Sequence, residues 1–288
     1  MIRFSTRVDC PPLPVKASLN DSIMVLGSCF ADGIGDRLKA AGFNVCVNPF
    51  GTLYNPVSIA NSAARMQFGK PFGPQECVEV GAGDGRICSW WHHTSFARRD
   101  AEEFLLGANA AFEKASAFWK GCNKVIITLG TAMVWRKVSD GEVVSNCLKR
   151  PAAEFNHELL PVGQVGEILS GMVRRHPDKE FIFTVSPIRH MGDGAHANSV
   201  SKSTLILALE ELLSREGFRC CYFPAYEILL DELRDYRFYA EDMLHPAKTA
   251  VDYIWQRFLE AAVPAEDLPA VAENEKAARK AAHRVMSE

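Results

Sequence analysis

The sequence contains no apolar run of about 18 residues, the length that a membrane-spanning helix requires. Residues 1–16, MIRFSTRVDCPPLPVK, lack the continuous apolar core of a secretory signal. The formal net charge is only −3, and no segment is dense in Lys and Arg, so a nucleic acid would find no basic surface. These absences predict a soluble, cytoplasmic protein that binds neither membranes nor nucleic acids.

Cysteine pairs at metal-binding spacing are also absent. The nine cysteines are an odd number, and none of them belongs to a Cys-x-x-Cys pair. This pattern argues against both a disulfide framework and a structural zinc site. We therefore expect mostly buried thiols in a reducing compartment.

The chain does contain several short, nearly continuous apolar segments, each followed by turn or capping residues. Such segments are typical of strands that are buried on both faces. With 288 residues, of which 48% are hydrophobic, the chain can bury a substantial core. The predicted strands cover residues 22–26, 44–47, 124–129, 180–185 and 218–223.

Helical patterns lie between these segments. Strands that alternate with helices indicate βαβ crossovers and a mainly parallel sheet covered on both sides. The sequence therefore predicts an α/β fold of the doubly wound kind. The predicted helices cover residues 32–41, 56–67, 101–120, 162–175, 199–216 and 246–262.

Two segments interrupt this alternation. Residues 77–95 and 136–151 each contain an Asp-Gly turn and are expected to form hairpins inserted beside the sheet. The segment 265–288 is rich in Ala, Glu, Lys and Arg, which predicts a C-terminal helical extension. We expect residues 1–264 to form a single domain.

The stretch VLGSCFADGIGD, residues 25–36, passes from a strand into a helix without a loop. Ligands of open parallel sheets bind at the carboxyl ends of the strands, where Ser28 would lie. The unpaired N–H groups at the start of a helix also stabilise developing negative charge. Ser28 is thus either a nucleophile or a helix cap, and Cys29 is a less favoured nucleophile.

A second feature is the pair Asp242 and His245, which directly precedes Pro246. At this spacing the carboxylate can bond the Nδ1–H of the imidazole, while Nε2 faces a serine hydroxyl, as in a Ser-His-Asp triad. The chain order is Ser, Asp, His, and there is no Gly-x-Ser-x-Gly elbow. This arrangement departs from the α/β-hydrolases.

Residues 27–31, GSCFA, spell the signature of the GSCFA family, which is similar to the SGNH, or GDSL, hydrolases. The resemblance covers most of the chain, and its motifs are long and specific. Further stretches that resemble the family are NPFGTLYNPVSI (48–59), TLGTA (128–132), TVSPIRH (184–190) and DELRDYRFYAEDMLHP (231–246).

This resemblance implies a flavodoxin-like, three-layer α/β/α fold with a mainly parallel central sheet of about five strands. It also implies a triad of Ser28, His245 and Asp242. By likeness to the second SGNH motif, the backbone N–H of Gly51 would join that of Ser28 in the oxyanion hole.

The third SGNH motif is where this sequence differs from the pattern. SGNH enzymes usually have Gly-x-Asn there, whereas this chain has Gly130-Thr131-Ala132. The side-chain amide of Asn55 or the hydroxyl of Thr131 could replace the missing donor. However, Asn55 precedes Pro56 and is also an ordinary helix cap, which is the interpretation we favour.

Four further residues are candidates for the substrate pocket. His190 and Arg189 follow the fourth predicted strand; the histidine either contacts substrate or stabilises a turn, and the arginine binds an anionic group or pairs with a surface carboxylate. Trp91 and His93 belong to a Trp-Trp-His-His run. Adjacent histidines face opposite ways on a strand and are poor joint metal ligands, so a pocket wall is the better interpretation.

Together these features predict a serine-dependent ester hydrolase that acts on a small-molecule or glycan-linked ester without a metal or organic cofactor. The same site would also suit an O-acyltransferase, in which a hydroxyl replaces water. A binding protein without turnover is a third alternative, because the asparagine donor is missing.

Overall fold

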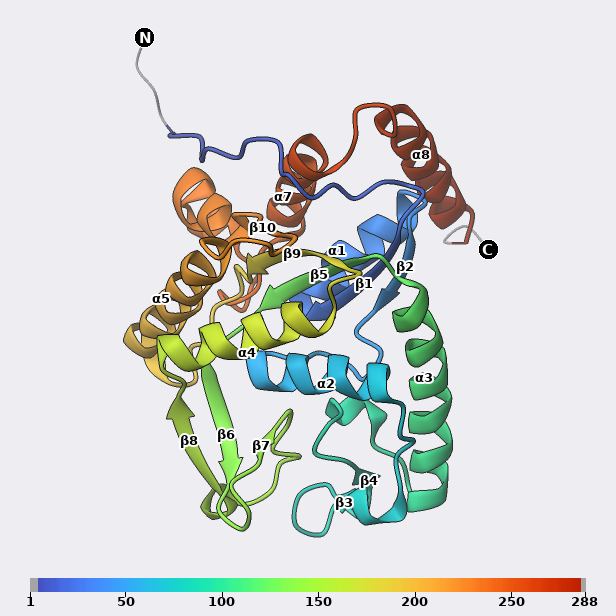
Figure 1. The fold of residues 1–288 in the computed structure, drawn as a ribbon, viewed down its shortest axis with the longest axis vertical. Coiled ribbons are helices and arrows are strands. Elements are labelled where there is room, and N and C mark those ends of the chain that lie inside the picture. The colour runs from blue at the N-terminus through green and yellow to red at the C-terminus, as the bar shows by residue number, and fades with distance from the viewer. Residues whose placement is uncertain (1–4, 286–288) are drawn as a thin grey trace.

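A five-stranded parallel sheet forms the centre of the computed structural model, which describes residues 5–285 (Figure 1). Every neighbouring pair of strands is parallel. Their order across the sheet is the flavodoxin-like order, so the predicted fold class is confirmed. The strands, in spatial order, are β2 (Asn44–Val47), β1 (Ser22–Gly27), β5 (Lys124–Leu129), β9 (Glu180–Val185) and β10 (Cys220–Tyr222).

Each central strand supplies residues to both faces of the sheet. Met24 and Leu26 of β1 belong to the hydrophobic cluster on one face, whereas Ile23 and Val25 belong to the cluster on the other. Side chains alternate along a strand, so a strand covered on both faces must be apolar throughout. This is why the strands are the most readable part of the sequence.

Helices cover both faces, and their buried residues show which helix covers which face. The first cluster contains residues of α2 (Pro56–Phe68), α3 (Ala101–Gly121), α4 (Val162–Arg175) and α5 (Gly194–Leu213). The second contains residues of α1 (Cys29–Ala40), α7 (Lys248–Ala262) and α8 (Leu268–Val285).

The predicted helices are all present, but two of them begin earlier than expected. Helix α1 begins at Cys29 because Ser28 caps it directly at the end of β1. Helix α5 begins at Gly194. Its first turns, GAHANS, lack the apolar periodicity that marks a buried face, so the sequence pattern placed the start of the helix too late.

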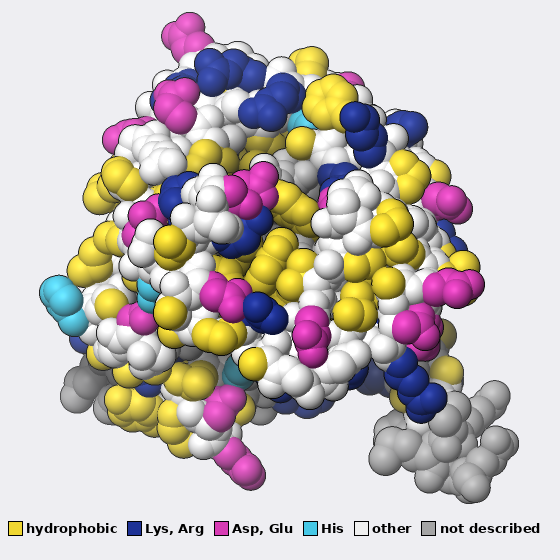
Figure 2. Space-filling model, turned by 90° about the horizontal axis from the view of Figure 1, so that it is seen from below, with side chains coloured by type: hydrophobic (Ala, Val, Ile, Leu, Met, Phe, Trp, Pro, Cys, Tyr) yellow, Lys and Arg dark blue, Asp and Glu magenta, His cyan; other side chains and the backbone are white. Residues whose placement is uncertain are grey.

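Both segments that interrupt the alternation form antiparallel pairs at the lower side of Figure 1. In the first, β3 (Val78–Glu79) pairs with β4 (Ile87–Cys88). In the second, β6 (Met133–Lys137) pairs with β7 (Val143–Val144) and also with β8 (Phe155–Leu159), a strand that the sequence did not reveal. The face between these small sheets is hollowed, and hydrophobic side chains gather in the hollow (Figure 2).

The remaining helical segments are short. A short α6 (Ala225–Glu227) continues into a π-helix at Ile228–Leu233. Single 3₁₀ turns cover Pro74–Glu76, Thr94–Phe96, Ala152–Glu154 and Tyr236–Phe238. Within residues 5–285, no helix has the length and hydrophobicity needed to cross a bilayer.

Helix α8 lies against its own chain. Asn274 Nδ2 donates to the carbonyl oxygen of Ala41 at 3.0 Å, and Trp255 Nε1 donates to Glu275 at 2.7 Å. Val271 is buried in the cluster shared by α1 and α7. The alanine-rich end of the chain therefore completes one outer layer of the sheet.

Candidate active site

Ser28 lies at the junction of β1 and α1, and it caps the helix. Its Oγ accepts a hydrogen bond from Phe30 N at 3.3 Å and lies 3.3 Å from Thr128 Oγ1. Its own N–H donates to the carbonyl oxygen of Thr128 at 3.2 Å and to Thr128 Oγ1 at 3.1 Å. Ser28 is buried. Its hydroxyl and its N–H both contact Thr128 of β5.

Gly27 makes this close approach to β5 feasible. It has a φ of 142°, and a Cβ at this position would lie 2.2 Å from the carbonyl oxygen of Thr128. Any other residue would push the two strands apart. The sequence Gly-Ser at the strand end therefore fixes the hydroxyl of Ser28 beside the carboxyl end of β5.

Asp242 and His245 form the hydrogen-bonded pair that their spacing predicts. Asp242 Oδ2 lies 2.6 Å from His245 Nδ1, while Oδ1 accepts from the backbone N–H groups of His245 and Leu244, each at 2.9 Å. These backbone bonds and the imidazole bond lower the pKa of Asp242 to about 2. The carboxylate thus orients the imidazole, whose Nε2 has no partner among the described residues.

The loop that carries this pair is attached to the segment after β9. The backbone N–H of Arg189 donates to the carbonyl oxygen of Leu244, and its guanidinium donates to that of Met243, both at 3.1 Å. The carbonyl oxygen of His245 accepts from Ala240 N at 2.8 Å. The Asp–His pair is therefore held beside the carboxyl end of the sheet.

Tyr54 connects the ends of several strands, and the sequence analysis did not single it out. Its carbonyl oxygen accepts from the N–H groups of Gly130 and Thr131, at 2.8 and 2.9 Å. Its hydroxyl lies 3.5 Å from Cys29 Sγ, and its ring packs edge-on against His190 at 5.5 Å between centroids. Burial raises the pKa of Tyr54 to about 12, so the phenol stays protonated.

Ser28 and His245 form no hydrogen bond in this structure. The hydroxyl of Ser28 is directed to Phe30 N and Thr128, whereas the imidazole of His245 is half exposed. The structure therefore joins Asp242 to His245 but leaves Ser28 in its capping position. Catalytic hydrogen bonds are often long or poorly aligned before substrate binds.

The three predicted oxyanion donors other than Ser28 differ in their partners. The N–H of Gly51 donates to the carbonyl oxygen of Asn48 at 2.8 Å, and Thr131 Oγ1 bonds Ser201 Oγ at 2.9 Å. Asn55 Oδ1 accepts from Ser58 N at 2.9 Å and so caps α2. Asn55 is buried, and this cap is the hydrogen bond that its side chain forms within residues 5–285.

The residues predicted to line the pocket lie in different places. Arg189 is positioned beside the His245 loop, and its guanidinium lies 5.6 Å from the centre of the Tyr239 ring. His190 is mostly buried; burial lowers its pKa to about 4, and its Nε2 has no partner in the described part of the chain. His93 caps a 3₁₀ turn and abuts Gly51, where an added Cβ would lie 2.3 Å from His93 Cβ. Trp91 lines a cavity of about 500 Å³ beside α2.

Lys202 is a second residue that sequence reasoning missed. Its Nζ donates to the carbonyl oxygens of Gly130 and Ser186, each at 2.7 Å, which lie just beyond β5 and β9. The side chain is fully buried, and burial lowers its pKa to about 7. A lysine on the apolar stripe of a helix, in register with Leu205 and Leu209, was the available signal.

No group of three or more His, Cys, Asp or Glu residues in the described part of the chain could hold a metal ion. All nine cysteines are free thiols.

The fold and the geometry at the strand ends define a flavodoxin-like α/β/α protein that carries a capping serine and an oriented Asp–His pair. The chain belongs to the GSCFA family, because the model of that family matches residues 22–258. The match contains Ser28, Asn55, Asp242 and His245, and it confirms the family that the motifs indicated. Comparisons with curated proteins and with solved structures gave no match.

Proposed function

We propose that this protein is a serine-dependent ester hydrolase that acts through Ser28, His245 and Asp242. The observation that carries the proposal is the 2.6 Å bond between Asp242 and His245, held at the sheet edge where Ser28 also lies. A carboxylate with a pKa of about 2 stays ionised at every working pH and stabilises the imidazolium that forms during the reaction.

In the proposed reaction, Ser28 first rotates away from its capping position toward His245. Nε2 of His245 takes the hydroxyl proton, and Oγ attacks the ester carbonyl carbon. The tetrahedral intermediate collapses, and the alcohol leaves with the proton from His245. Water then attacks the acyl carbon and gives a proton to Nε2. The bond between the acyl carbon and Oγ breaks, Nε2 returns the proton to Oγ, and the acid leaves.

The developing oxyanion needs donors that are not already occupied. The N–H groups of Ser28 and Gly51 donate to Thr128 and Asn48 in this structure, so they could serve only after these bonds exchange. We therefore assign a principal donor role to the side-chain amide of Asn55. Its Oδ1 caps α2, and this bond fixes the orientation of the free amide nitrogen.

We propose a small-molecule or glycan-linked ester as the substrate and the cytoplasm as the location. The nine free thiols support a reducing compartment. The activity requires no metal or organic cofactor. Product analysis with added sugar or metabolite hydroxyls separates hydrolysis from O-acyl transfer.

The test is covalent labelling with a fluorophosphonate, followed by intact mass measurement and peptide mapping. We expect one adduct on Ser28 in the wild type and none in Ser28→Ala. His245→Gln and Asp242→Asn should slow labelling by about 10²-fold or more, since each removes a triad member. Ser199→Ala, which replaces an exposed helical serine, is the matched control and should label at the wild-type rate.

A folded wild type that does not label at Ser28 would contradict the proposal. It would leave the non-catalytic binding protein as the remaining interpretation of the same fold.

A further inference from the structure

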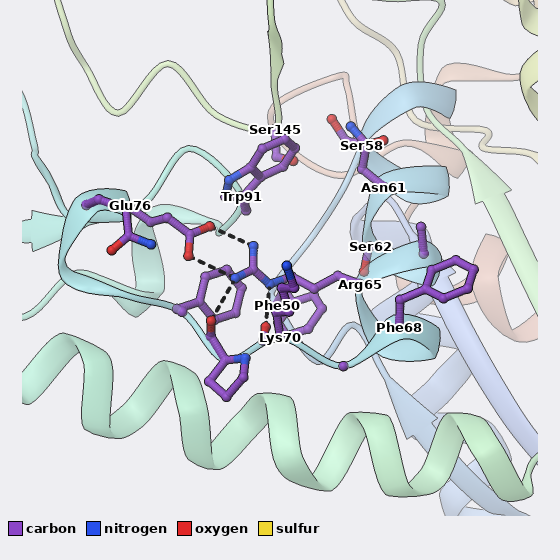
Figure 3. A pocket seen from close by; sticks show the side chains of 15 residues that line it. Phe50, Ser58, Asn61, Ser62, Arg65, Phe68, Lys70, Glu76, Trp91 and Ser145 are labelled. Carbon is purple, nitrogen blue, oxygen red and sulfur yellow. Dashed lines mark hydrogen bonds and ion pairs between the residues drawn. The ribbon is translucent and has the colours of Figure 1, made fainter.

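A cavity of about 500 Å³ lies beside helix α2, between that helix and the segment 70–76 (Figure 3). The rings of Phe50, Phe72 and Trp91 contribute to its wall, and Phe68 stands at its rim with 70% of its surface exposed. Its size falls within the range of small-molecule binding sites.

Arg65 of α2 connects the helix to the segment 70–76 on the other side of the cavity. Its guanidinium bonds both carboxylate oxygens of Glu76, at 2.7 and 2.9 Å, and the carbonyl oxygens of Lys70 and Pro71, both at 3.2 Å. It also stacks on the ring of Phe72 at 3.6 Å. Figure 3 shows these bonds spanning from α2 to the facing segment. The cavity is therefore preformed, and the charge of Arg65 is neutralised within it.

The serines on this face of α2 do not make the cavity polar. The hydroxyl oxygens of Ser58 and Ser62 are buried beneath the surface and have no hydrogen-bond partner among the described residues. Lys70 and Gln75 are exposed and lie toward solvent. An occupant of the interior thus meets mainly rings and aliphatic carbon, which favours an uncharged apolar group.

At one end, the cavity is lined by residues that lie next to candidate site residues along the chain. Phe50 directly precedes Gly51, and the backbone N–H of Ser58 donates to Asn55 Oδ1 in the cap of α2. Trp91 is two residues from His93, which abuts Gly51. The cavity then runs along α2, from its first turn to Phe68 in its last. A group attached to a carbonyl near Asn55 could extend into it along the helix.

We propose that this cavity holds the acyl chain of the substrate, so that the enzyme prefers esters of unbranched, medium-length acids. The inference rests on the proposed function, but the cavity can be tested separately because a chain can bind without being cleaved. Ala64 of α2 lines the cavity and is the position for blocking it, because a tryptophan there would add a bulky ring to the cavity wall.

The first experiment measures binding of sodium decanoate by calorimetry, below its micelle concentration, in Ser28→Ala protein. We expect saturable binding that weakens at least tenfold when Ala64→Trp is added. Ala277→Trp, on the exposed face of α8, is the matched control and should bind as Ser28→Ala does. Absence of binding, or equal binding by both tryptophan variants, would overturn the inference.

The second experiment measures kcat/KM for p-nitrophenyl acetate, butyrate, hexanoate and octanoate. We expect roughly a threefold rise for each methylene that becomes buried. Ala64→Trp should lower the octanoate-to-acetate ratio at least tenfold, and Ala277→Trp should not change it. Hydrolysis with no dependence on chain length would reject the cavity assignment alone, whereas decanoate binding without any hydrolysis would reject the proposed function alone.

Discussion

At the scale of single residues, Asn55 shows how one side chain can have two roles. Its Oδ1 caps α2, while its amide nitrogen is free to donate. Serine caps a helix about as well as asparagine but cannot supply that donor. We therefore expect Asn55→Ser to keep the melting temperature within about 2 °C and to lower kcat by about 10²–10³-fold.

This prediction separates the helix cap from the oxyanion donor, which the sequence left as alternatives. Asn55→Ala removes both functions and should lose stability as well, by about 1 kcal/mol. A fully active Asn55→Ser enzyme would mean that Asn55 is only a cap. Thermal melts and steady-state kinetics on the two variants distinguish these results.

Lys202 is the other residue whose structural role leads to a prediction. Its folded-state pKa of about 7 lies below the ordinary 10.5, so between these pH values the unfolded chain binds more protons than the folded protein. The free energy of unfolding therefore rises with pH across that window, by up to about 1.4 kcal/mol per pH unit. Below pH 7 the full cost of burying the ammonium is present.

Lys202→Met removes this pH dependence and leaves the carbonyl oxygens of Gly130 and Ser186 unpaired. We expect the variant to be less stable than the wild type by about 2 kcal/mol at pH 9, and the difference to shrink toward pH 7. Urea unfolding at pH 7, 8 and 9 measures it. A constant difference at all three pH values would show that the lysine does not titrate there.

At the scale of elements, the packing of α8 makes the C-terminal segment part of the hydrophobic core. Val271 is buried against α1 and α7, whereas Ala277 on the same helix is exposed. Val271→Asp places a charge in an apolar interface and should cost about 3 kcal/mol, while Ala277→Asp should change stability by less than about 0.5 kcal/mol. Thermal melts of the two variants compare a buried and an exposed site on one helix. Equal melting temperatures would show that α8 does not stabilise the rest of the chain.

At the scale of the whole molecule, the two hydrophobic clusters share their strands. Neighbouring residues of β1, β5 and β9 point into opposite clusters, as Ile126 and Ile127 do. One cluster therefore cannot unfold without exposing the backs of the strands that support the other. We expect a single urea transition, with tryptophan fluorescence and far-UV circular dichroism giving the same midpoint.

Trp119 lies in one cluster and Trp255 in the other, so fluorescence reports on both faces. Removing the second probe by Trp255→Phe should leave the fluorescence midpoint equal to that from circular dichroism of the same variant. Two separate transitions would contradict the single domain predicted for residues 1–264.

The strands and most helices were predictable because their signals are local. A strand buried on both faces is apolar in every residue, and a covering helix repeats its apolar residues every three or four positions. The strand β8 was not predictable, since FNHEL has no such pattern and becomes a strand by pairing with β6. The early start of α5 was missed for the same reason, because its first turns bury no apolar stripe.

The sequence by itself determined the alternation of strands and helices, the GSCFA motifs, and the pairing of Asp242 with His245, because two residues three positions apart in one loop cannot lie far apart. Only the tertiary structure decided what depends on segments distant in the chain. It showed that Thr128 occupies the N–H of Ser28, that Tyr54 joins the strand ends, and that Lys202 binds two of their carbonyl oxygens. These contacts form because the sheet brings separate loops together. No local pattern in the sequence encodes which distant residues become neighbours.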